Sequence, residues 1–202
     1  MRSVLIITIL LNGIFQAYSQ QDSVMSEIQS YHDKLNSEFA DPKESPLTEE
    51  DRQKFTALDF FPIDLKFRVE AKFIRTPNQK PFKMATTTAR LPVYEKYGEI
   101  HFMIDSQQFM LEVYQNHQLR ETEEYKDYLF LPFTDLTNGE ESYGGGRYLE
   151  MSIPAGDSII VDFNKAYNPY CAYNKKYSCP LVPRQNRVKT RILAGVKAYK
   201  HP

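Results

Sequence analysis

The chain has 202 residues, with 25 lysines and arginines against 26 aspartates and glutamates and a formal net charge of −1 at pH 7. It contains no basic run, which excludes a nucleic-acid-binding protein that works through a cationic face. Its 14 tyrosines and 13 phenylalanines, with no tryptophan, favour strands over helices, and its length suits one domain.

The first nineteen residues have the pattern of a cleaved signal peptide. Arg2 is followed by an uncharged apolar stretch over residues 4–15, and Ala17 and Ser19 supply the small residues that precede a cleavage site. A membrane anchor is the alternative, but the apolar stretch is shorter than the ~20 residues that span a bilayer. We therefore expect cleavage after Ser19, export to the periplasm or the extracellular space, and no membrane span.

Two helices are expected next, ahead of the strands. Apolar residues recur at three- and four-residue spacing, which places them on one face of a helix over residues 22–39. These residues are Val24, Ile28, Tyr31, Leu35 and Phe39. Thr48 followed by three acidic residues predicts a second, short helix over residues 48–57. The expected division is a signal peptide at 1–19, a helical extension at 20–43 and a single β-rich domain at 44–202.

From Leu65 onward, apolar and polar residues alternate, as in a strand with one solvated face. The alternation is clearest over residues 65–73. Residues 100–104 and 109–113 are expected to form a hairpin around Asp105 and Ser106. Further strands are expected at residues 82–88, 128–133, 148–153, 159–163 and 188–196. This series predicts a mainly β fold, an antiparallel barrel or sandwich of about eight strands with one or two N-terminal helices.

Four of the eight glycines lie between residues 139 and 146, and three of them are consecutive. Consecutive glycines let the backbone adopt positive φ and approach another surface closely. A flexible hairpin tip would explain them equally well. A binding loop is favoured by the flanking Tyr143, Arg147 and Tyr148, because a flexible tip does not need a planar cation among aromatic rings.

A second polar cluster follows the strand expected at residues 159–163. Its motifs are Asp162-Phe163-Asn164, Asn168-Pro169, Cys171-Ala172, Cys179-Pro180 and Asn186-Arg187. Together with Tyr143-Gly144-Gly145-Gly146-Arg147, they resemble the hallmark stretches of a bacterial family called domain of unknown function 1684. The resemblance covers roughly residues 44–197 and departs from the family pattern at Tyr170, where a second proline is common. It implies no particular activity, because the family has no settled one.

Cys171 and Cys179 allow three interpretations. In an exported protein thiols tend to pair, and a disulfide closing this nine-residue loop would stabilise the fold by roughly 2.5 kcal/mol. A nucleophilic thiolate would need a base or a cationic setting. A metal site would need further ligands, and none of the four histidines, His32, His101, His117 and His201, lies at ligand spacing from either cysteine. The sequence predicts no metal and no cofactor.

Three functions compete on this evidence. The first is a module that binds a small anionic or carbonyl-bearing ligand at a rim formed by the loops at 144–148 and 164–179, because arginine forks suit such groups. Its candidate residues are Tyr143, Arg147, Tyr148, Asn164, Asn168, Asn186 and Arg187. The second is a hydrolase that uses Cys171 or Asp162, with Arg147 stabilising negative charge. The third is a structural protein of the envelope.

The shared rim depends on one structural expectation. The strands at 148–153 and 159–163 are separated by five residues, a connection that suits a hairpin. A hairpin would bring the loop that enters the first strand and the loop that leaves the second to the same end. There Arg147 would serve a ligand or hold the second loop by hydrogen bonds.

The signal-peptide interpretation predicts that the exported protein begins at or near Gln20. Intact-mass spectrometry of protein recovered from the medium or the periplasm should give the mass of residues 20–202. Exported protein that retains Met1 would contradict this prediction.

Overall fold

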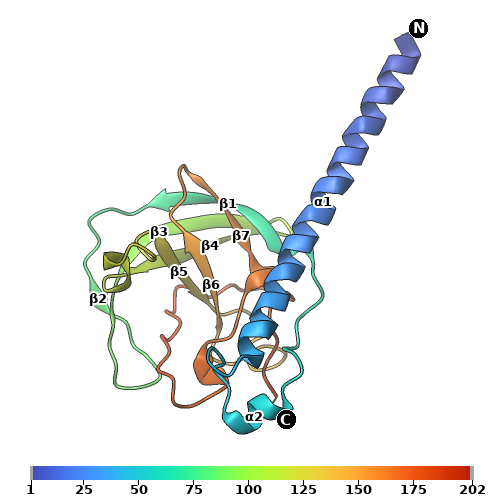
Figure 1. Ribbon diagram of the computed structural model, residues 1–202. Coiled ribbons are helices and arrows are strands. Elements are labelled where there is room, and N and C mark those ends of the chain that lie inside the picture. The colour runs from blue at the N-terminus through green and yellow to red at the C-terminus, as the bar shows by residue number, and fades with distance from the viewer. Residues whose placement is uncertain (1, 201–202) are drawn as a thin grey trace.

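The computed structural model describes the backbone of residues 2–200 and the side chains of residues 20–200 (Figure 1). The helices are α1 (Arg2–Ala40) and α2 (Glu49–Lys54). The strands are β1 (Arg68–Arg75), β2 (Phe82–Lys83), β3 (Val93–Ile104), β4 (Gln107–Asn116), β5 (Tyr128–Phe133), β6 (Arg147–Ser152) and β7 (Ser158–Asp162). Short 3-10 helices lie at Leu65–Phe67, Leu119–Glu121, Phe163–Lys165 and Tyr170–Ala172.

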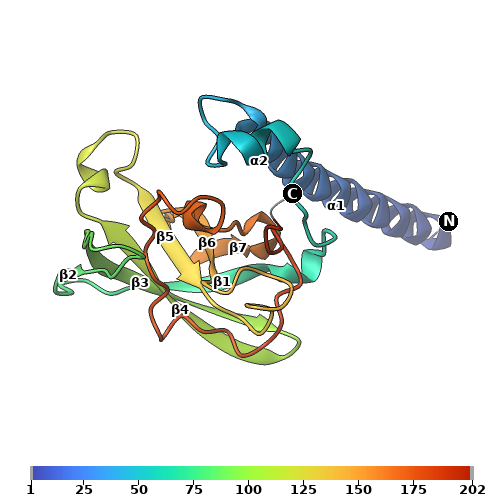
Figure 2. The same cartoon turned by 90° about the horizontal axis from the view of Figure 1, so that it is seen from below.

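The seven strands found among the described residues form one antiparallel sheet with the order β6-β5-β4-β3-β1-β7, and β2 pairs with the edge of β3. The sheet curls into a half-barrel (Figure 2). The expected hairpin is confirmed in β3 and β4, which pair from Ile104↔Gln107 to Tyr94↔Asn116. The mainly β, antiparallel fold predicted from the sequence is therefore confirmed.

The inner face of the curled sheet carries the main core, to which a C-terminal segment contributes. Leu111, Leu129 and Phe133 from the strands are fully or almost fully buried there. Val188, Ile192 and Ala194 are each 0% exposed in the same cluster. The segment containing them crosses the open side of the half-barrel (Figure 2). This segment, residues 187–198, supplies the wall that the sheet lacks, and we call it the C-terminal wall.

The prediction of a strand at residues 188–196 is wrong, because these residues belong to the C-terminal wall, which lies outside the named strands. It makes isolated bridges, Thr134↔Arg187 and Phe60↔Val196, in place of a ladder. Gly195 interrupts any extended run, since its φ is +76° and a Cβ there would lie 2.5 Å from the carbonyl oxygen of Ala166. The wall thus depends on irregular contacts made by its backbone.

The prediction that residues 148–153 and 159–163 form a hairpin is also wrong. β6 pairs with β5 and β7 pairs with β1, so the two strands are opposite ends of the sheet order. The five-residue connection was compatible with a hairpin, but in a curled sheet it can instead bridge the gap between the two edge strands. One bridge, Tyr148↔Tyr167, joins β6 to the chain that follows β7.

α1 contains the helix expected at residues 22–39, and its C-terminal half packs on the domain (Figure 1). Ile28 and Phe39 are buried, and His32 stacks on Phe60 with 3.8 Å between ring centroids. The second expected helix is confirmed as α2, where the side chain of Thr48 accepts a hydrogen bond from the amide of Asp51. Within the part of the chain described, no helix is long and apolar enough to cross a membrane.

Candidate functional site

Arg147 lies in the interior, where it joins β6 to the C-terminal wall. Its guanidinium forms an ion pair with Asp135 at 2.7 Å, and both side chains are 0% exposed. It also donates to the carbonyl oxygens of Ile192, at 2.9 Å, and Ala194. Burial lowers the pKa of Arg147, while the Asp135 carboxylate opposes that shift. The structure therefore favours the expectation that Arg147 holds a neighbouring segment by hydrogen bonds.

The alternation of side chains along β6 places Arg147 and Tyr148 in different surroundings. Successive side chains of a strand point to opposite faces, so Arg147 and Leu149 reach the inner core while Tyr148 and Glu150 lie on the outer face. Tyr148 packs with Tyr94 and Phe130 in a separate aromatic cluster on that face, and its hydroxyl donates to the carbonyl oxygen of Pro180. The two neighbours singled out in the sequence consequently belong to opposite faces of β6.

Asn164 and Asp162 fix the turn after β7. Oδ1 of Asp162 accepts from the backbone amide of Asn164 at 3.0 Å and from its side-chain amide at 2.9 Å. The Asn164 side chain also bonds the backbone of Asp64 through both its oxygen and its nitrogen. The other carboxylate oxygen of Asp162 lies 3.5 Å from the guanidinium of Arg68. These contacts cap and tether a loop, and none of the groups that Asn164 and Asp162 bind is also bound by Arg147.

Asn168 and Asn186 also tether separate segments. The side-chain nitrogen of Asn186 donates to the carbonyl oxygens of Glu112 and Pro132, and its oxygen accepts from the amide of Glu112 at 2.9 Å. Asn168 donates to the carbonyl oxygen of Lys197 at 2.8 Å. Arg187, by contrast, is exposed. The buried asparagines thus bind main chain on β4, β5 and the C-terminal wall.

Cys171 and Cys179 are free cysteines in this structure, so the expected disulfide is not formed. The amide of Cys171 lies 3.1 Å from the sulfur of Cys179, and the hydroxyl of Tyr143 lies 4.0 Å from the sulfur of Cys171. A hydrogen bond from Cys179 lowers the pKa of Cys171 to about 6. No cluster of three or more metal-binding side chains occurs among the residues described.

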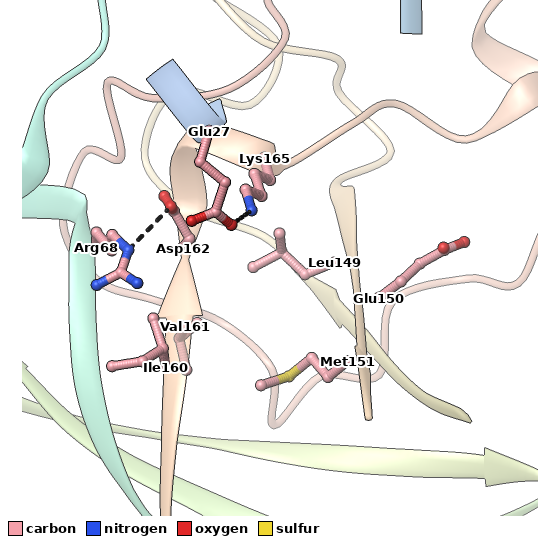
Figure 3. Close-up of a pocket in the computed structure, with 9 residues that line it drawn as sticks. All are labelled: Glu27, Arg68, Leu149, Glu150, Met151, Ile160, Val161, Asp162 and Lys165. Carbon is pink, nitrogen blue, oxygen red and sulfur yellow. Dashed lines mark hydrogen bonds and ion pairs between the residues drawn. The ribbon is translucent and has the colours of Figure 1, made fainter. Parts of the chain in front are cut away.

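A pocket of about 250 Å³ occupies the gap between β6 and β7. Its charges are paired: Lys165 contacts Glu27 of α1 at 2.5 Å, and Arg68 contacts Asp162. Figure 3 shows these pairs beside the apolar floor, and it shows the carboxylate of Glu150 pointing away from them. The pocket therefore offers little unpaired charge to a ligand, whereas Glu150 is oriented toward a different space.

That space is a groove on the outer face, which we call the tyrosine groove. It consists of two adjoining pockets of about 270 and 330 Å³ that share Glu150, Tyr167 and Tyr170. The first pocket is lined by six tyrosines: Tyr94, Tyr128, Tyr148, Tyr167, Tyr170 and Tyr177. The second lies under α1 and adds Tyr31 and Tyr125, with Lys34, Glu38 and Glu44. Part of the wall comes from the loop at 164–179 that the sequence had singled out.

Glu150 is the charged centre of the tyrosine groove. The hydroxyl of Tyr167 donates to its Oε1 at 2.8 Å, and that of Tyr128 lies 3.4 Å from the same atom. Burial and the neighbouring negative charge raise the pKa of both phenols, so they stay protonated and keep donating. Glu150 is exposed and forms no ion pair with any side chain of residues 20–200. A carboxylate and aromatic faces are thus available together.

The sequence reasoning missed Glu150 and most of these tyrosines. They come from α1, β3, the loop before β5, β5 itself, β6 and the chain after β7, so no local motif gathers them. One usable signal existed: the alternation of β6 places Glu150 on the same face as Tyr148. Following that face from Tyr148 would have led to Glu150.

Comparison with known proteins confirms the family resemblance. The family described as "Protein of unknown function (DUF1684)" matches residues 53–197. The fold is similar to the solution NMR structure of an uncharacterized protein from Haloarcula marismortui, with a TM-score of 0.69 and 31% sequence identity over 89% of this chain and 96% of that one. A search of curated proteins gave no match.

The position of Arg147 predicts that Arg147→Lys destabilises the fold by about 3 kcal/mol. Lysine keeps the charge but cannot reach Asp135 and two carbonyl oxygens at once, which leaves buried groups without partners. Urea unfolding should show this loss, and Arg187→Lys at an exposed arginine should change stability by less than about 0.5 kcal/mol. Equal effects of the two substitutions would contradict the structural role of Arg147.

Proposed function

The chain belongs to the family of proteins of unknown function called DUF1684, and from the geometry of its outer face we propose that it is an exported module that binds a small organic cation in the tyrosine groove. The observation that carries the proposal is Glu150, an exposed carboxylate that accepts from the hydroxyl of Tyr167 and pairs with no cationic side chain of residues 20–200. A ligand cation would supply the missing charge.

The lining of the groove favours a cation over an anion. Glu38, Glu44 and Glu150 contribute three carboxylates, against the single ammonium of Lys34. Lys34 is already 3.6 Å from Glu38 and its side chain is 76% exposed, so it points largely into solvent. An anionic ligand would meet repulsion here, and neither Arg147 nor Arg187 lines either pocket. The proposed site thus keeps the loop at 164–179 expected from the sequence, while the proposed ligand changes from an anionic or carbonyl-bearing molecule to a cation.

The aromatic rings supply the second element of recognition. Cations are attracted to the faces of tyrosine rings by about 0.5–2 kcal/mol per contact, and a set of such rings suits alkylated ammonium groups. The rings are held in place: those of Tyr148 and Tyr167 meet edge to face at 5.9 Å, and those of Tyr170 and Tyr177 lie 5.2 Å apart. This packing fixes the walls before a ligand arrives, which lowers the entropy cost of binding.

Export is the second part of the proposal, and it rests on the pattern of residues 1–19. Cleavage after Ser19 would retain the side chains by which α1 packs on the domain. Ile28, His32 and Phe39, all buried, lie beyond that point. Tyr31, which lines the groove, is retained as well. The mature chain would therefore keep both the fold and the groove.

The proposal predicts that choline binds the protein and that Glu150→Gln weakens this binding at least tenfold, the equivalent of about 1.4 kcal/mol. Glutamine keeps the shape and a hydrogen-bonding oxygen but removes the charge. NMR titration with choline would measure the affinity, with Glu123→Gln as a control because Glu123 is exposed outside the groove.

A matched pair of ligands separates charge from shape. 3,3-Dimethylbutanol has the outline of choline without its charge, so it should bind at least tenfold more weakly to the unmodified protein. Equal binding of the two compounds, or binding of acetate in preference to choline, would contradict the proposal. The second result would restore the anionic ligand expected from the sequence.

A further inference from the structure

The two free cysteines lie where the wall of the tyrosine groove meets the domain. Cys179 lines the groove together with Tyr177 and Ser178, while Cys171 lies in the 3-10 helix Tyr170–Ala172 that begins with another groove residue. The two cysteines bracket seven residues of this wall. A change in the distance between their sulfur atoms would therefore move the groove.

The two cysteines differ in exposure and in how they are held. Cys179 is 6% exposed and is anchored to the neighbouring loop, since its carbonyl oxygen accepts from the amide of Thr87 and its amide donates to the hydroxyl of that residue. Cys171 is half-buried and can be reached from solvent. Its backbone amide lies 3.1 Å from the sulfur of Cys179. Cys171 is thus accessible to solvent, whereas Cys179 is buried beside it.

The surroundings of Cys171 stabilise its thiolate. The hydroxyl of Tyr143 lies 4.0 Å from its sulfur, and the sulfur of Cys179 lies 3.1 Å from its backbone amide. The neighbouring Cys179 lowers the pKa of Cys171 to about 6, and Cys171 in turn raises the pKa of Cys179. Since the thiolate is the reactive form of cysteine and must be reached from solvent, the half-buried Cys171 beside the Tyr143 hydroxyl fits the role of nucleophile, and the buried Cys179 fits that of resolving thiol.

We propose that Cys171 and Cys179 form a reversible redox switch, oxidised by a hydroperoxide, that changes the shape of the tyrosine groove. The part concerning the groove rests on the proposed function, whereas the switch itself rests on the two thiols. The structure represents the reduced form. Forming the disulfide would shorten the distance between the sulfur atoms to about 2 Å and draw the 3-10 helix of Cys171 toward the anchored Cys179.

The chemistry balances with one molecule of hydrogen peroxide. The Cys171 thiolate attacks one peroxide oxygen, an S–O bond forms, the O–O bond breaks, and hydroxide leaves and takes up a proton as water. The sulfur of Cys179, as it loses its proton, then attacks the sulfenic sulfur of Cys171. The S–S bond forms, the S–O bond breaks, and a second water leaves with that proton. Two thiols are oxidised and one peroxide is reduced to two waters.

The test begins with fully reduced protein treated with one equivalent of hydrogen peroxide. Intact-mass spectrometry and thiol titration should show loss of both thiols and of two hydrogen atoms, restored by dithiothreitol. Cys179→Ser should stop at a sulfenic acid that dimedone traps, while Cys171→Ser should react at least tenfold more slowly than Cys179→Ser. An unreactive native protein, or variants that react equally fast, would overturn the assignment of roles.

Choline titration of the reduced and oxidised proteins tests the link to the groove. We expect at least a threefold difference in affinity between the two forms, and no difference after peroxide treatment of the Cys171→Ser variant. Equal affinities would overturn control of the groove. If neither form binds choline while the disulfide still forms and reopens, the proposed function fails and the redox switch stands.

Discussion

The buried ion pair between Arg147 and Asp135 is the interaction on which the rest of the structure depends. The sheet does not close by itself, because its two edge strands, β6 and β7, are not paired with each other. The C-terminal wall covers the open side, and Arg147 binds two of its carbonyl oxygens while Asp135 accepts from the amide of Ile192. Two charges that would be costly to bury alone stabilise an irregular segment because each is paired with the other and hydrogen-bonded to that segment.

The same strand carries core side chains on one face and the side chains of the tyrosine groove on the other. The inner side chains of β6, Arg147 and Leu149, belong to the core, while Tyr148 and Glu150 belong to the outer face. The groove can therefore carry an unpaired carboxylate without weakening the interior. The loop that contains Cys171 and Cys179 completes the wall of the groove. The part of the groove that is built on a loop is therefore the part that the proposed oxidation would change.

Patterns among neighbouring residues predicted the strands, whose formation depends on those neighbours. The alternation at residues 65–73 and 109–113 identified parts of β1 and β4, because one wet face imposes period two. The sequence singled out the hallmark residues, but Arg147, Asn164 and Asn186 are buried tethers that each bind at least one partner 12 to 100 residues away along the chain. No local pattern shows such partners. The edge positions of β6 and β7 depend on the curl of the whole sheet, and so does the gathering of tyrosines from six parts of the chain.

Native-state hydrogen exchange measures whether the C-terminal wall unfolds together with the sheet. If the wall is part of the cooperative structure, the amides of Val188, Ile192 and Val196, which are all hydrogen-bonded, should exchange within about tenfold of the rates of β3 and β4. If these three amides exchange at rates typical of an unprotected chain while the sheet remains protected, the wall is not part of the cooperative structure.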